Sequence, residues 1–311
     1  MLLSCGDALI DFVPTQNAAG REAVMPAVGG SCLNVAIGMA RLGAPSGFVG
    51  GISNDLFGRM IADHAAASNV ELGLATRSDH QTTLAFVRIV AGESHYAFYD
   101  AETATRSWTY QRGTIPFADV EALHVGSTTL VNDRGAAETG ALIADARASS
   151  TISFDPNCRP NLVKDKPAYL ARMAEFAGHA DLIKMSDVDF AYLFGDEPYR
   201  QRANAMLGQG ASLVVITRGN DGAIAWHAAA GQIEVQAPTI EVADTIGAGD
   251  SFQAALLFAL HKQGRLVRQQ LKAIGADELR RTLSFAANCA GLTCTRPGAD
   301  PPWSHEIKWS W

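Results

Sequence analysis

A glycine-rich turn that leads into a helix carries the residues best suited to chemistry in this chain. The segment 244–251 reads Asp-Thr-Ile-Gly-Ala-Gly-Asp-Ser and precedes an apolar run with helical periodicity. Gly247, Ala248 and Gly249 allow close approach to the backbone, and the free N–H groups of a first helical turn bind anions such as phosphate. Asp250 lies in the same turn, where its carboxylate can accept a proton from an attacking hydroxyl. Such a turn can serve phosphoryl transfer, with Asp250 as the general base and the neighbouring amides as the site of the transferred group.

This turn has a plain structural explanation and two competing functional ones. An aspartate in a first helical turn can serve only to complement the helix dipole, so Gly-Ala-Gly-Asp does not decide alone. A dinucleotide-binding oxidoreductase needs GxGxxG at the first strand–helix turn. Gly6-Asp-Ala stands there instead, and Phe252 occupies the place of the third glycine in the later segment. The sequence contains no Walker A pattern, GxxxxGK[ST], which excludes the P-loop kinases and ATPases.

Composition narrows the class of protein further. The 311 residues are 48% hydrophobic, enough for a large α/β core, and a net charge of −7 leaves no basic surplus for a nucleic-acid partner. The five cysteines show no CxxC spacing and the eight histidines no HExxH, so no zinc site is expected. An acidic residue as early as Asp7, and the lack of about 18 consecutive apolar residues, predict a cytoplasmic protein without a membrane partner.

Alternating strand and helix patterns predict an α/β fold with a mostly parallel sheet. Strands are expected at Leu2–Val13, Ser46–Gly50, Ala122–Gly126, Thr151–Phe154, Asp181–Lys184 and Leu213–Thr217. Helices are expected at Ser31–Leu42, Phe57–Ala67, Gly135–Ala148, Ala168–Ala177, Asp187–Leu193 and from the glycine-rich turn to about Leu260.

The pattern changes between residues 82 and 99, where two β-type runs flank Gly92 with no helix between them. Such a hairpin is typical of a flap. In open α/β sheets, ligands bind beyond the carboxyl ends of the strands, where an inserted flap can cover them. We therefore expect one domain over residues 1–311, with a lid formed by about 12–26 and 82–106.

Two motifs resemble the signatures of one enzyme family. The segment 244–252 is similar to the C-terminal signature of the ribokinase-like (phosphofructokinase B) family of sugar kinases. The segment 28–43, Val-Gly-Gly-Ser-Cys-Leu-Asn-Val-Ala-Ile-Gly-Met-Ala-Arg-Leu-Gly, resembles the N-terminal signature, as does 48–58 after it. The resemblance covers nearly the whole chain. It implies a ribokinase-like three-layer sandwich with a β-hairpin lid, and transfer of phosphate from ATP, with Mg²⁺, to a small sugar.

The resemblance also implies a sugar site built from short polar side chains and close backbone. The residues at matching positions are Asp11, Gly30, Ser31, Asn34, Phe98, Arg106 and Arg159. A polyol needs such hydrogen-bonding groups. Without the resemblance, Asp11 would be explained as an acid that closes the first strand into a turn, and Asn34 as an ordinary polar residue at a helix start.

Two further segments match nucleotide-binding positions of the family. One is the DxNxR-like segment 155–159, and the other is Thr-Arg-Gly-Asn-Asp-Gly at 217–222, directly after an apolar strand. The residues assigned to ATP are Asn157, Ser186, Thr217, Gly219, Gly222 and Gly249. Both segments are also good turn formers, so a plain turn and a strand–turn–strand hairpin are alternative explanations.

The expected cation sites depend most on the resemblance. Where many relatives have Asn-x-x-Glu, this chain has Ser186-Asp-Val-Asp189, so Asp189 would reach Mg²⁺ through water. The family also binds a monovalent cation such as K⁺ through carbonyl oxygens beside the anion site. The matching residues are Asp244, Ile246, Thr293, Arg296 and Gly298.

The substrate expected from the resemblance is D-fructose, since the segments 92–108 and 295–302 look like those of bacterial fructokinases in this family. Asp100, directly after the flap aromatics, would repel an acid sugar such as 2-keto-3-deoxygluconate, and Leu9 and Gly126 offer ribose few polar groups. The alternatives are another sugar kinase of the family and a non-catalytic sugar or nucleotide sensor. A homodimer through the lid is the expected assembly.

Overall fold

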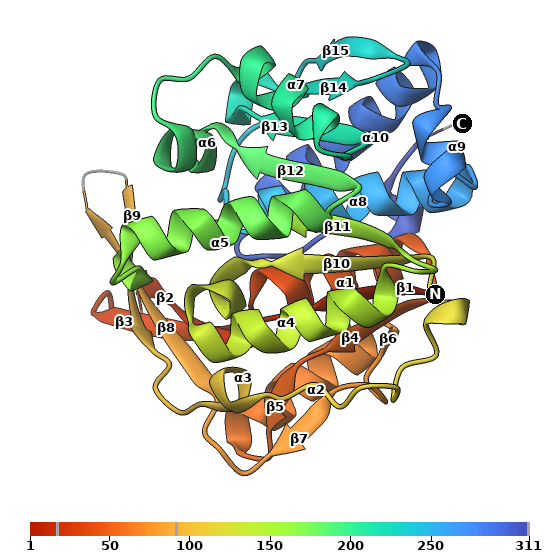
Figure 1. Cartoon of the computed structure of the whole chain (residues 1–311). Helices are drawn as coiled ribbons and strands as arrows, with labels where there is room; N and C mark the ends of the chain where they lie inside the picture. Colours follow the sequence, from red (N-terminus) through yellow and green to blue (C-terminus); the bar gives the residue numbers. More distant parts are fainter. Residues whose placement is uncertain (17–18, 91–92, 310–311) are drawn as a thin grey trace.

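The computed structural model describes residues 1–16, 19–90 and 93–309, which form a three-layer α/β arrangement (Figure 1). Nine described strands make the central sheet, which is parallel except for the two antiparallel pairs formed by β13, β14 and β15. In sheet order the strands are β15 (Gly231–Val235), β14 (Ala223–His227), β13 (Leu213–Thr217), β12 (Leu182–Ser186), β11 (Thr151–Asp155), β10 (Ala122–Gly126), β1 (Leu2–Cys5), β4 (Ser46–Val49) and β6 (Val70–Glu71).

Helices cover both faces of this sheet. Successive strand residues point to opposite faces, and those on either face are mostly apolar. Leu3 of β1 joins the core under one set of helices, and Leu2 joins the core on the other side. The first set is α4 (Asp133–Ala146), α5 (Lys166–His179), α6 (Asp187–Phe194) and α7 (Tyr199–Gly208). The second is α1 (Ser31–Leu42), α8 (Ala248–Lys262), α9 (Arg268–Lys272) and α10 (Ala276–Cys294). Two more helices, α2 (Leu56–Ala67) and α3 (Ala104–Ser107), lie near the smaller sheets.

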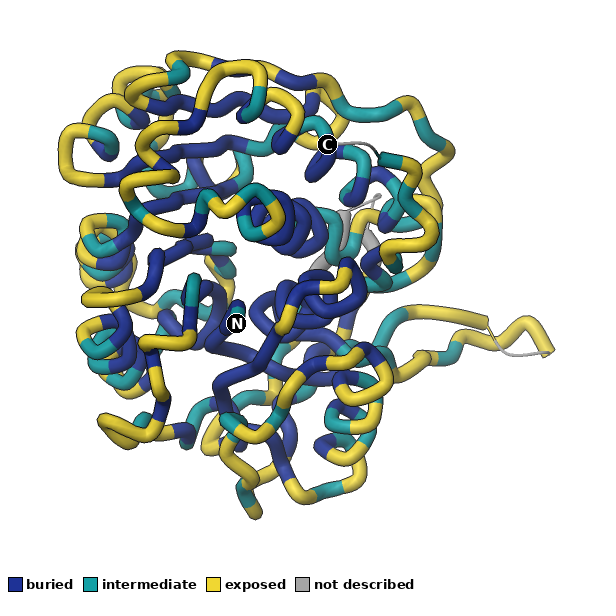
Figure 2. Tube along the Cα trace, turned by 90° about the vertical axis from the view of Figure 1, so that its right-hand side faces the viewer, coloured by how far each residue is buried: buried dark blue, intermediate teal, exposed yellow. Residues whose placement is uncertain are grey.

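Buried residues concentrate in the central sheet and in the helices packed on it, whereas loops at the rim are exposed (Figure 2). None of the described helices is long and apolar enough to cross a membrane.

A second, four-stranded sheet stands at the carboxyl edge of the first (Figure 1). Its strands, in order, are β3 (Glu22–Gly29), β2 (Leu9–Gln16), β8 (Thr83–Val90) and β9 (Glu93–Tyr99). The predicted hairpin is confirmed, since β8 and β9 pair antiparallel. A separate short pair joins β5 (Gly51–Ser53) to β7 (Thr76–Ser78).

The prediction of one strand over Leu2–Val13 is wrong, because the chain passes from the central sheet to the second sheet between β1 and β2. Gly6 makes the break: a Cβ there would lie 2.4 Å from Sγ of Cys32. The turn places Asp7 under the start of α1, where its Oδ1 accepts a hydrogen bond from the Cys32 amide at 3.0 Å. Apolar residues on both sides of the break concealed it in the sequence. The other predicted strands and helices are present, with ends shifted by a few residues.

The helices α1 and α8 pack closely enough for their N-terminal ends to meet. Gly38 of α1 allows this approach, since a Cβ there would lie 2.6 Å from Cβ of Ala254 on α8. Both helices are almost entirely buried. The side chains at the two N-terminal ends therefore face the same space beyond the sheet.

Candidate active site

A cavity of about 540 Å³ lies beyond the carboxyl ends of the central strands, where α1 and α8 begin. Several segments distant in the sequence form its wall, including the second sheet. The predicted site residues that line it are Asp11, Gly30, Ser31, Asn34, Phe98, Asn157, Arg159, Ser186, Asp189, Thr217, Gly219, Ile246, Gly247, Gly249 and Asp250. The two signature motifs thus meet at one cavity, as the resemblance implies.

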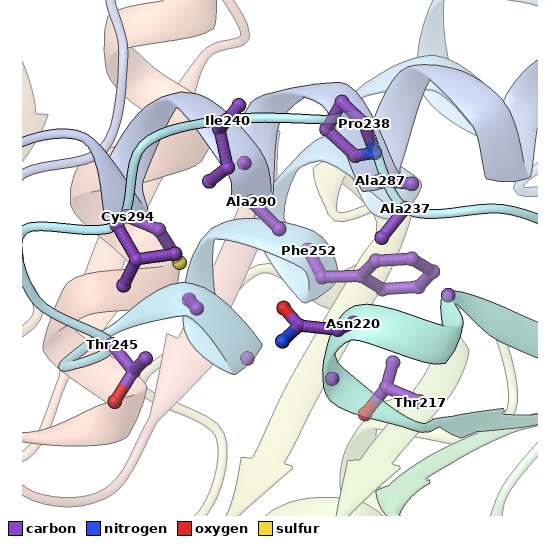
Figure 3. Close-up of a pocket in the computed structure, with 16 residues that line it drawn as sticks. Thr217, Asn220, Ala237, Pro238, Ile240, Thr245, Phe252, Ala287, Ala290 and Cys294 are labelled. Atoms are coloured by element: carbon purple, nitrogen blue, oxygen red, sulfur yellow. The ribbon is translucent and has the colours of Figure 1, made fainter.

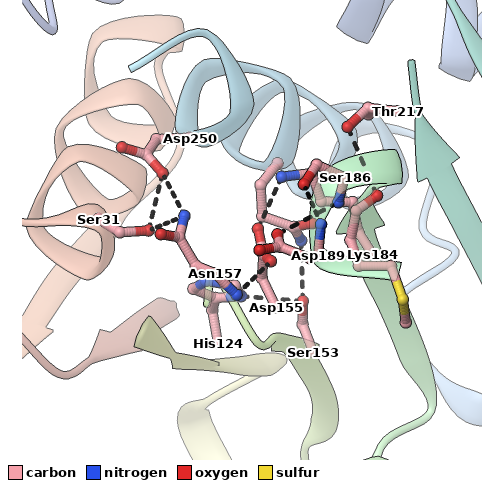
Figure 4. Close-up of polar contacts among 12 residues, drawn as sticks. Ser31, His124, Ser153, Asp155, Asn157, Lys184, Ser186, Asp189, Thr217 and Asp250 are labelled. Carbon is pink, nitrogen blue, oxygen red and sulfur yellow. Dashed lines mark hydrogen bonds and ion pairs between the residues drawn. The ribbon is translucent and has the colours of Figure 1, made fainter. Parts of the chain in front are cut away.

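Asp250 is held in place by side chains from two other elements (Figure 4). Its Oδ1 accepts from the Ser31 hydroxyl at 2.7 Å and from Asn157 Nδ2 at 3.4 Å, and its Oδ2 accepts from Asn34 Nδ2 at 2.9 Å. Burial raises the pKa of Asp250 above its ordinary value, while the hydrogen bonds from Asn34 and Ser31 act in the opposite direction. A fixed carboxylate with a raised pKa is well suited to accept a proton.

The turn before Asp250 requires glycine for two reasons. Gly247 precedes α8 with φ of 76°, and a Cβ there would lie 2.6 Å from Cβ of Ala299. A Cβ on Gly249 would lie 3.1 Å from Nζ of Lys184. The backbone of the first turn is therefore open to a ligand, with a positive charge directly beside it. This combination favours a phosphate group.

Lys184 and Asp155 form a buried ion pair at the base of the cavity. Nζ of Lys184 lies 2.6 Å from Oδ2 of Asp155, and their side chains are only 3% and 2% exposed. Burial opposes the charge of Lys184, but the carboxylates of Asp155, Asp250 and Asp189 raise the pKa of this lysine above its ordinary value. Lys184 is therefore charged, and it lies close enough to the first turn of α8 to neutralise a bound phosphate.

Asn157 lies two residues after Asp155 and has a left-handed backbone conformation, with φ of 39°. Its backbone N–H donates to Oδ1 of Asp155 at 3.0 Å, and its side-chain Nδ2 donates to Ser31 Oγ at 3.1 Å. Asparagine tolerates this backbone conformation better than most residues. The turn in the segment 155–159 thus connects the ion pair to the residues around Asp250.

The other end of the cavity combines charge with aromatic surface from the second sheet. Asp11 of β2 lies beside Arg159, and Tyr96 and Phe98 of β9 stack with ring centroids 5.9 Å apart. Burial raises the pKa of Asp11 to about 7, against the lowering effect of Arg159. Carboxylate, guanidinium and ring faces together suit a polyol with apolar C–H surface.

Ser186 and Asp189 use their side chains to start α6. Asp189 N donates to Ser186 Oγ at 2.9 Å, Ser186 N to Asp189 Oδ2 at 3.4 Å, and Cys158 N to Asp189 Oδ1 at 2.9 Å. Both carboxylate oxygens thus already accept backbone hydrogen bonds. Within the described ranges, no group of three or more His, Cys, Asp or Glu residues could hold a metal ion. Mg²⁺ at this cavity would take its other ligands from phosphate and water.

A second, smaller cavity of about 180 Å³ adjoins the first, with Thr217, Gly219, Thr245 and Gly249 in both walls. Figure 3 shows Phe252, Pro238, Ile240 and Asn220 among the residues that line it. Ala248 and Gly222 of the predicted set line this cavity. Its largely apolar wall, next to an anion site, suits a nucleotide base.

Some predicted residues lie elsewhere. Arg106 is ion-paired with Asp100 and donates to the carbonyl of Thr128, and both charged residues line a different cavity. The argument that Asp100 repels an acid sugar is therefore not supported by the structure. Arg106 is not among the residues that line the main cavity, although Thr128, whose carbonyl it contacts, is.

The residues predicted for a monovalent cation lie behind the glycine-rich turn. Asp244 accepts at Oδ1 from the amide of Ile246 at 3.0 Å and at Oδ2 from the amide of Gly298 at 2.8 Å. Thr293 is buried with its hydroxyl bonded to the Cys289 carbonyl, and Arg296 pairs with Asp300 and Glu306. The turn and the C-terminal segment are thus joined through Asp244.

Comparison with known proteins places this site in a family. The family described as pfkB family carbohydrate kinase matches residues 1–306. The chain belongs to this family. A fructokinase from Rhizobium leguminosarum bv. trifolii is 36% identical over 280 residues, which span 90% of this chain and 86% of that protein. The resemblance predicted from the two motifs is confirmed.

Solved structures of pfkB-family relatives share the fold. The crystal structure of fructokinase with bound ATP from Xylella fastidiosa has a TM-score of 0.84 and 28% identity, over 96% of this chain and 93% of that one. A fructokinase double mutant from Vibrio cholerae O395, in a fructose-, ADP- and potassium-bound form, has a TM-score of 0.83 and 28% identity over the same shares. The ribokinase-like fold predicted from the sequence is thus confirmed.

Lys184 and Asp7 belong to the cavity of this kinase, but sequence reasoning did not select them. Lys184 is the one charge inside the apolar strand β12, which was the available signal. Asp7 accepts hydrogen bonds from Cys32, Ser127 and Thr128, and so anchors the start of α1. In the sequence, Asp7 could have been recognised as an acidic residue just beyond the first apolar strand.

Proposed function

We propose that this carbohydrate kinase is a fructokinase, which transfers the γ-phosphate of ATP to a hydroxyl group of D-fructose. One observation carries the proposal: the buried carboxylate of Asp250 lies in the same cavity as the sugar-suited groups of Asp11 and Arg159 and as the first turn of α8. The relatives from Rhizobium, Xylella and Vibrio, each named a fructokinase, support the choice of sugar.

The chemistry follows from the geometry of this cavity. Asp250 accepts the proton of the sugar hydroxyl while the oxygen of that hydroxyl bonds to the γ-phosphorus of ATP. The bond from that phosphorus to the bridging oxygen of ADP breaks, and ADP leaves with the electron pair. Lys184 and the amides at 247–249 stabilise the negative charge on the transferred group. Mg²⁺ supplies further neutralisation of the phosphates when it is bound.

We place the nucleotide across both cavities. The apolar cavity beside α10 would hold the base, with Thr217, Gly219 and Gly222 along the neighbouring loop. Gly222 is needed there, since a Cβ would lie 2.0 Å from the Val235 carbonyl oxygen. Asn157 and Ser186 line the larger cavity, on the side where the phosphates would lie.

We place the sugar between β2, β9 and the start of α1. Asp11, Gly30, Ser31, Asn34, Phe98 and Arg159 would form its site. Leu9 adds an apolar patch in the same wall. Arg106 is left out of the proposed site because its guanidinium is paired with Asp100 in another cavity.

We propose K⁺ as the monovalent cation, in the region of Asp244 and the C-terminal segment. Three observations support it: the hydrogen bonds that join Asp244 to Ile246 and Gly298, the adjacency to the glycine-rich turn, and the potassium present in the Vibrio structure. Such an ion would stabilise the turn that opens α8.

The second sheet is proposed as a lid over the sugar, formed by about residues 12–26 and 82–106, and as a dimer interface between two copies. On the outer face, Val24, Phe86 and Tyr99 are 48%, 37% and 64% exposed. Phe86 stacks on Phe12 and contacts the Tyr99 ring edge, so the three rings form a continuous apolar patch. Light scattering should give a dimer that Phe86→Glu converts to a monomer. The cytoplasmic location and the lack of a nucleic-acid partner stay predictions.

The choice of fructose is tested by kcat/KM for fructose, ribose, glucose, adenosine and 2-keto-3-deoxygluconate in one coupled assay of ADP release. Fructose should exceed every competitor. A competitor that exceeds fructose tenfold would overturn the choice of sugar while the kinase activity stands. No ADP release with any sugar would favour a sensor that keeps the fold without turnover.

A further inference from the structure

Three polar side chains that the proposed chemistry does not use are buried between α8 and the central sheet. Gln253 of α8 and Ser153 of β11 are 0% exposed, and His124 of β10 is 1% exposed. Gln253 Nε2 donates to Ser153 Oγ at 2.8 Å, and this oxygen lies 3.1 Å from Nδ1 of His124. Figure 4 shows His124 and Ser153 side by side below Asp155. The three side chains thus form one hydrogen-bonded chain across three elements.

Ser153 Oγ accepts from the Gln253 amide, and its own proton can be donated to Nδ1 of His124 when the imidazole carries its proton on Nε2. Burial lowers the pKa of His124 to about 4, with the nearby charge of Lys184 acting in the same direction. The imidazole is therefore neutral, and in the tautomer protonated at Nε2 its Nδ1 accepts from the Ser153 hydroxyl.

The spacing of these residues connects the two halves of the active site. Ser153 precedes Asp155 by two positions on β11, so both side chains lie on the same face of the strand. Gln253 follows Asp250 by three positions on α8, which places both on one side of the helix. The Gln253–Ser153 hydrogen bond therefore joins the helix that carries the base to the strand that carries the partner of Lys184.

This polar chain is an unfavourable way to fill a core. Oε1 of Gln253 is buried and has no hydrogen-bond partner, which an apolar side chain of the same length would avoid. Between Asp250 and His261, most other side chains of α8, such as Phe252, Ala254 and Leu256, make apolar contacts, which do not define one exact position along the helix axis. A directional hydrogen bond does define it.

We infer that Gln253, Ser153 and His124 are positioning residues of the kinase, which fix the distance between Asp250 and the Lys184–Asp155 pair. The inference rests on the proposed function. These hydrogen bonds would set a geometry that is needed in the transition state. Breaking them should therefore lower kcat and leave substrate binding almost unchanged.

The test uses Gln253→Met and Ser153→Ala in the full-length protein, with the best sugar of the panel and ATP. Each variant should unfold at a temperature no more than a few degrees from that of the natural protein, with kcat lowered about 10- to 100-fold and both KM values within about threefold. The double variant should be no slower than the slower single variant, because both changes break the same chain. His124→Asn, which keeps an acceptor near the position of Nδ1, should retain most of the kcat that His124→Leu loses.

Thr282→Val is the matched control. Thr282 is also fully buried and bonds Gln263, the residue that follows the last turn of α8, at the end of the helix far from Asp250. This variant should keep the kcat of the natural protein. Folded Gln253→Met or Ser153→Ala with unchanged kcat would overturn the inference, as would an equal loss in Thr282→Val. If Gln253→Met fails to fold, Ser153→Ala decides, since it removes one oxygen atom. A natural protein without kinase activity would instead overturn the proposed function.

Discussion

Oδ1 of Asp250 accepts a hydrogen bond from the hydroxyl of Ser31 at 2.7 Å, although 219 residues separate the two in the sequence. Ser31 begins α1 and Asp250 lies in the first turn of α8, so this bond joins the two signature motifs. Asn34, one turn further along α1, holds the other oxygen of the same carboxylate. The N-terminal motif therefore orients the base that the C-terminal motif supplies.

The turn that carries Asp250 lies beside the buried ion pair of Lys184 and Asp155. Lys184→Met should lower kcat about 100-fold or more, because the charge beside the first turn of α8 is lost. It should also lower the free energy of unfolding by about 3–5 kcal/mol, since it leaves Asp155 buried without its partner. Urea unfolding and the ADP-release assay measure the two effects.

The double variant Lys184→Met/Asp155→Asn separates these effects. It should recover most of the lost stability, because no unpaired charge stays buried, yet it should stay inactive. Recovery of activity together with stability would show that Lys184 has only a structural role.

Asp11 predicts a dependence of stability on pH. Its pKa is raised to about 7 in the folded protein from 3.8, so the folded protein binds this proton more tightly than the unfolded chain. The group therefore favours folding below about pH 4, and this contribution is lost as the pH rises to about 7. Asp11→Asn, which stays neutral, should be more stable than the natural protein at pH 8 by about 2–4 kcal/mol.

The same variant should raise KM for the sugar, because an amide replaces one of the two acceptor oxygens of the carboxylate with an NH2 donor. Urea unfolding at pH 4 and pH 8 measures the stability difference. A difference of equal size at both pH values would contradict the shifted pKa. An unchanged sugar KM would remove Asp11 from the sugar site.

The proposed lid makes a direct contact with the body of the molecule: Asn161 Nδ2 donates to the backbone carbonyl of Tyr96 at 2.9 Å. Adding fructose should slow hydrogen exchange in peptides from β8 and β9, and Asn161→Ala should weaken this protection. Peptides from α7, which faces away from the cavity, serve as the reference. Protection that develops only outside the second sheet would contradict a lid.

The sequence was informative where function demands unusual residues at fixed spacing. Glycine at 247 and 249 before Asp250 predicted a helix start open to phosphate, and the structure places this turn at the main cavity. The alternation of strands and helices was also visible, because buried parallel strands are uniformly apolar. That same uniformity concealed the break at Gly6.

Other parts of the site match no motif in the sequence. The wall of the smaller cavity uses Ala287, Ala290 and Gly291, whose contribution is shape alone. Lys184 gains its significance from Asp155, 29 residues away, and a single lysine in a strand matches no motif. Asp100 stands beside flap aromatics in the sequence, but its side chain turns to Arg106. Such outcomes depend on tertiary contacts that spacing does not encode.

The central claim is that Asp250 is the general base of a sugar kinase, and Asp250→Asn tests it most directly. The asparagine keeps the size of the side chain, its oxygen can still accept from the Ser31 hydroxyl, and its NH2 can donate to the unpartnered Oδ1 of Asn34 once that amide turns over. The fold and the KM for fructose should therefore change little. With saturating fructose and ATP, kcat should fall by about 100-fold or more, while the exposed control Asp63→Asn keeps the natural rate. A folded Asp250→Asn variant with near-normal kcat would contradict the account.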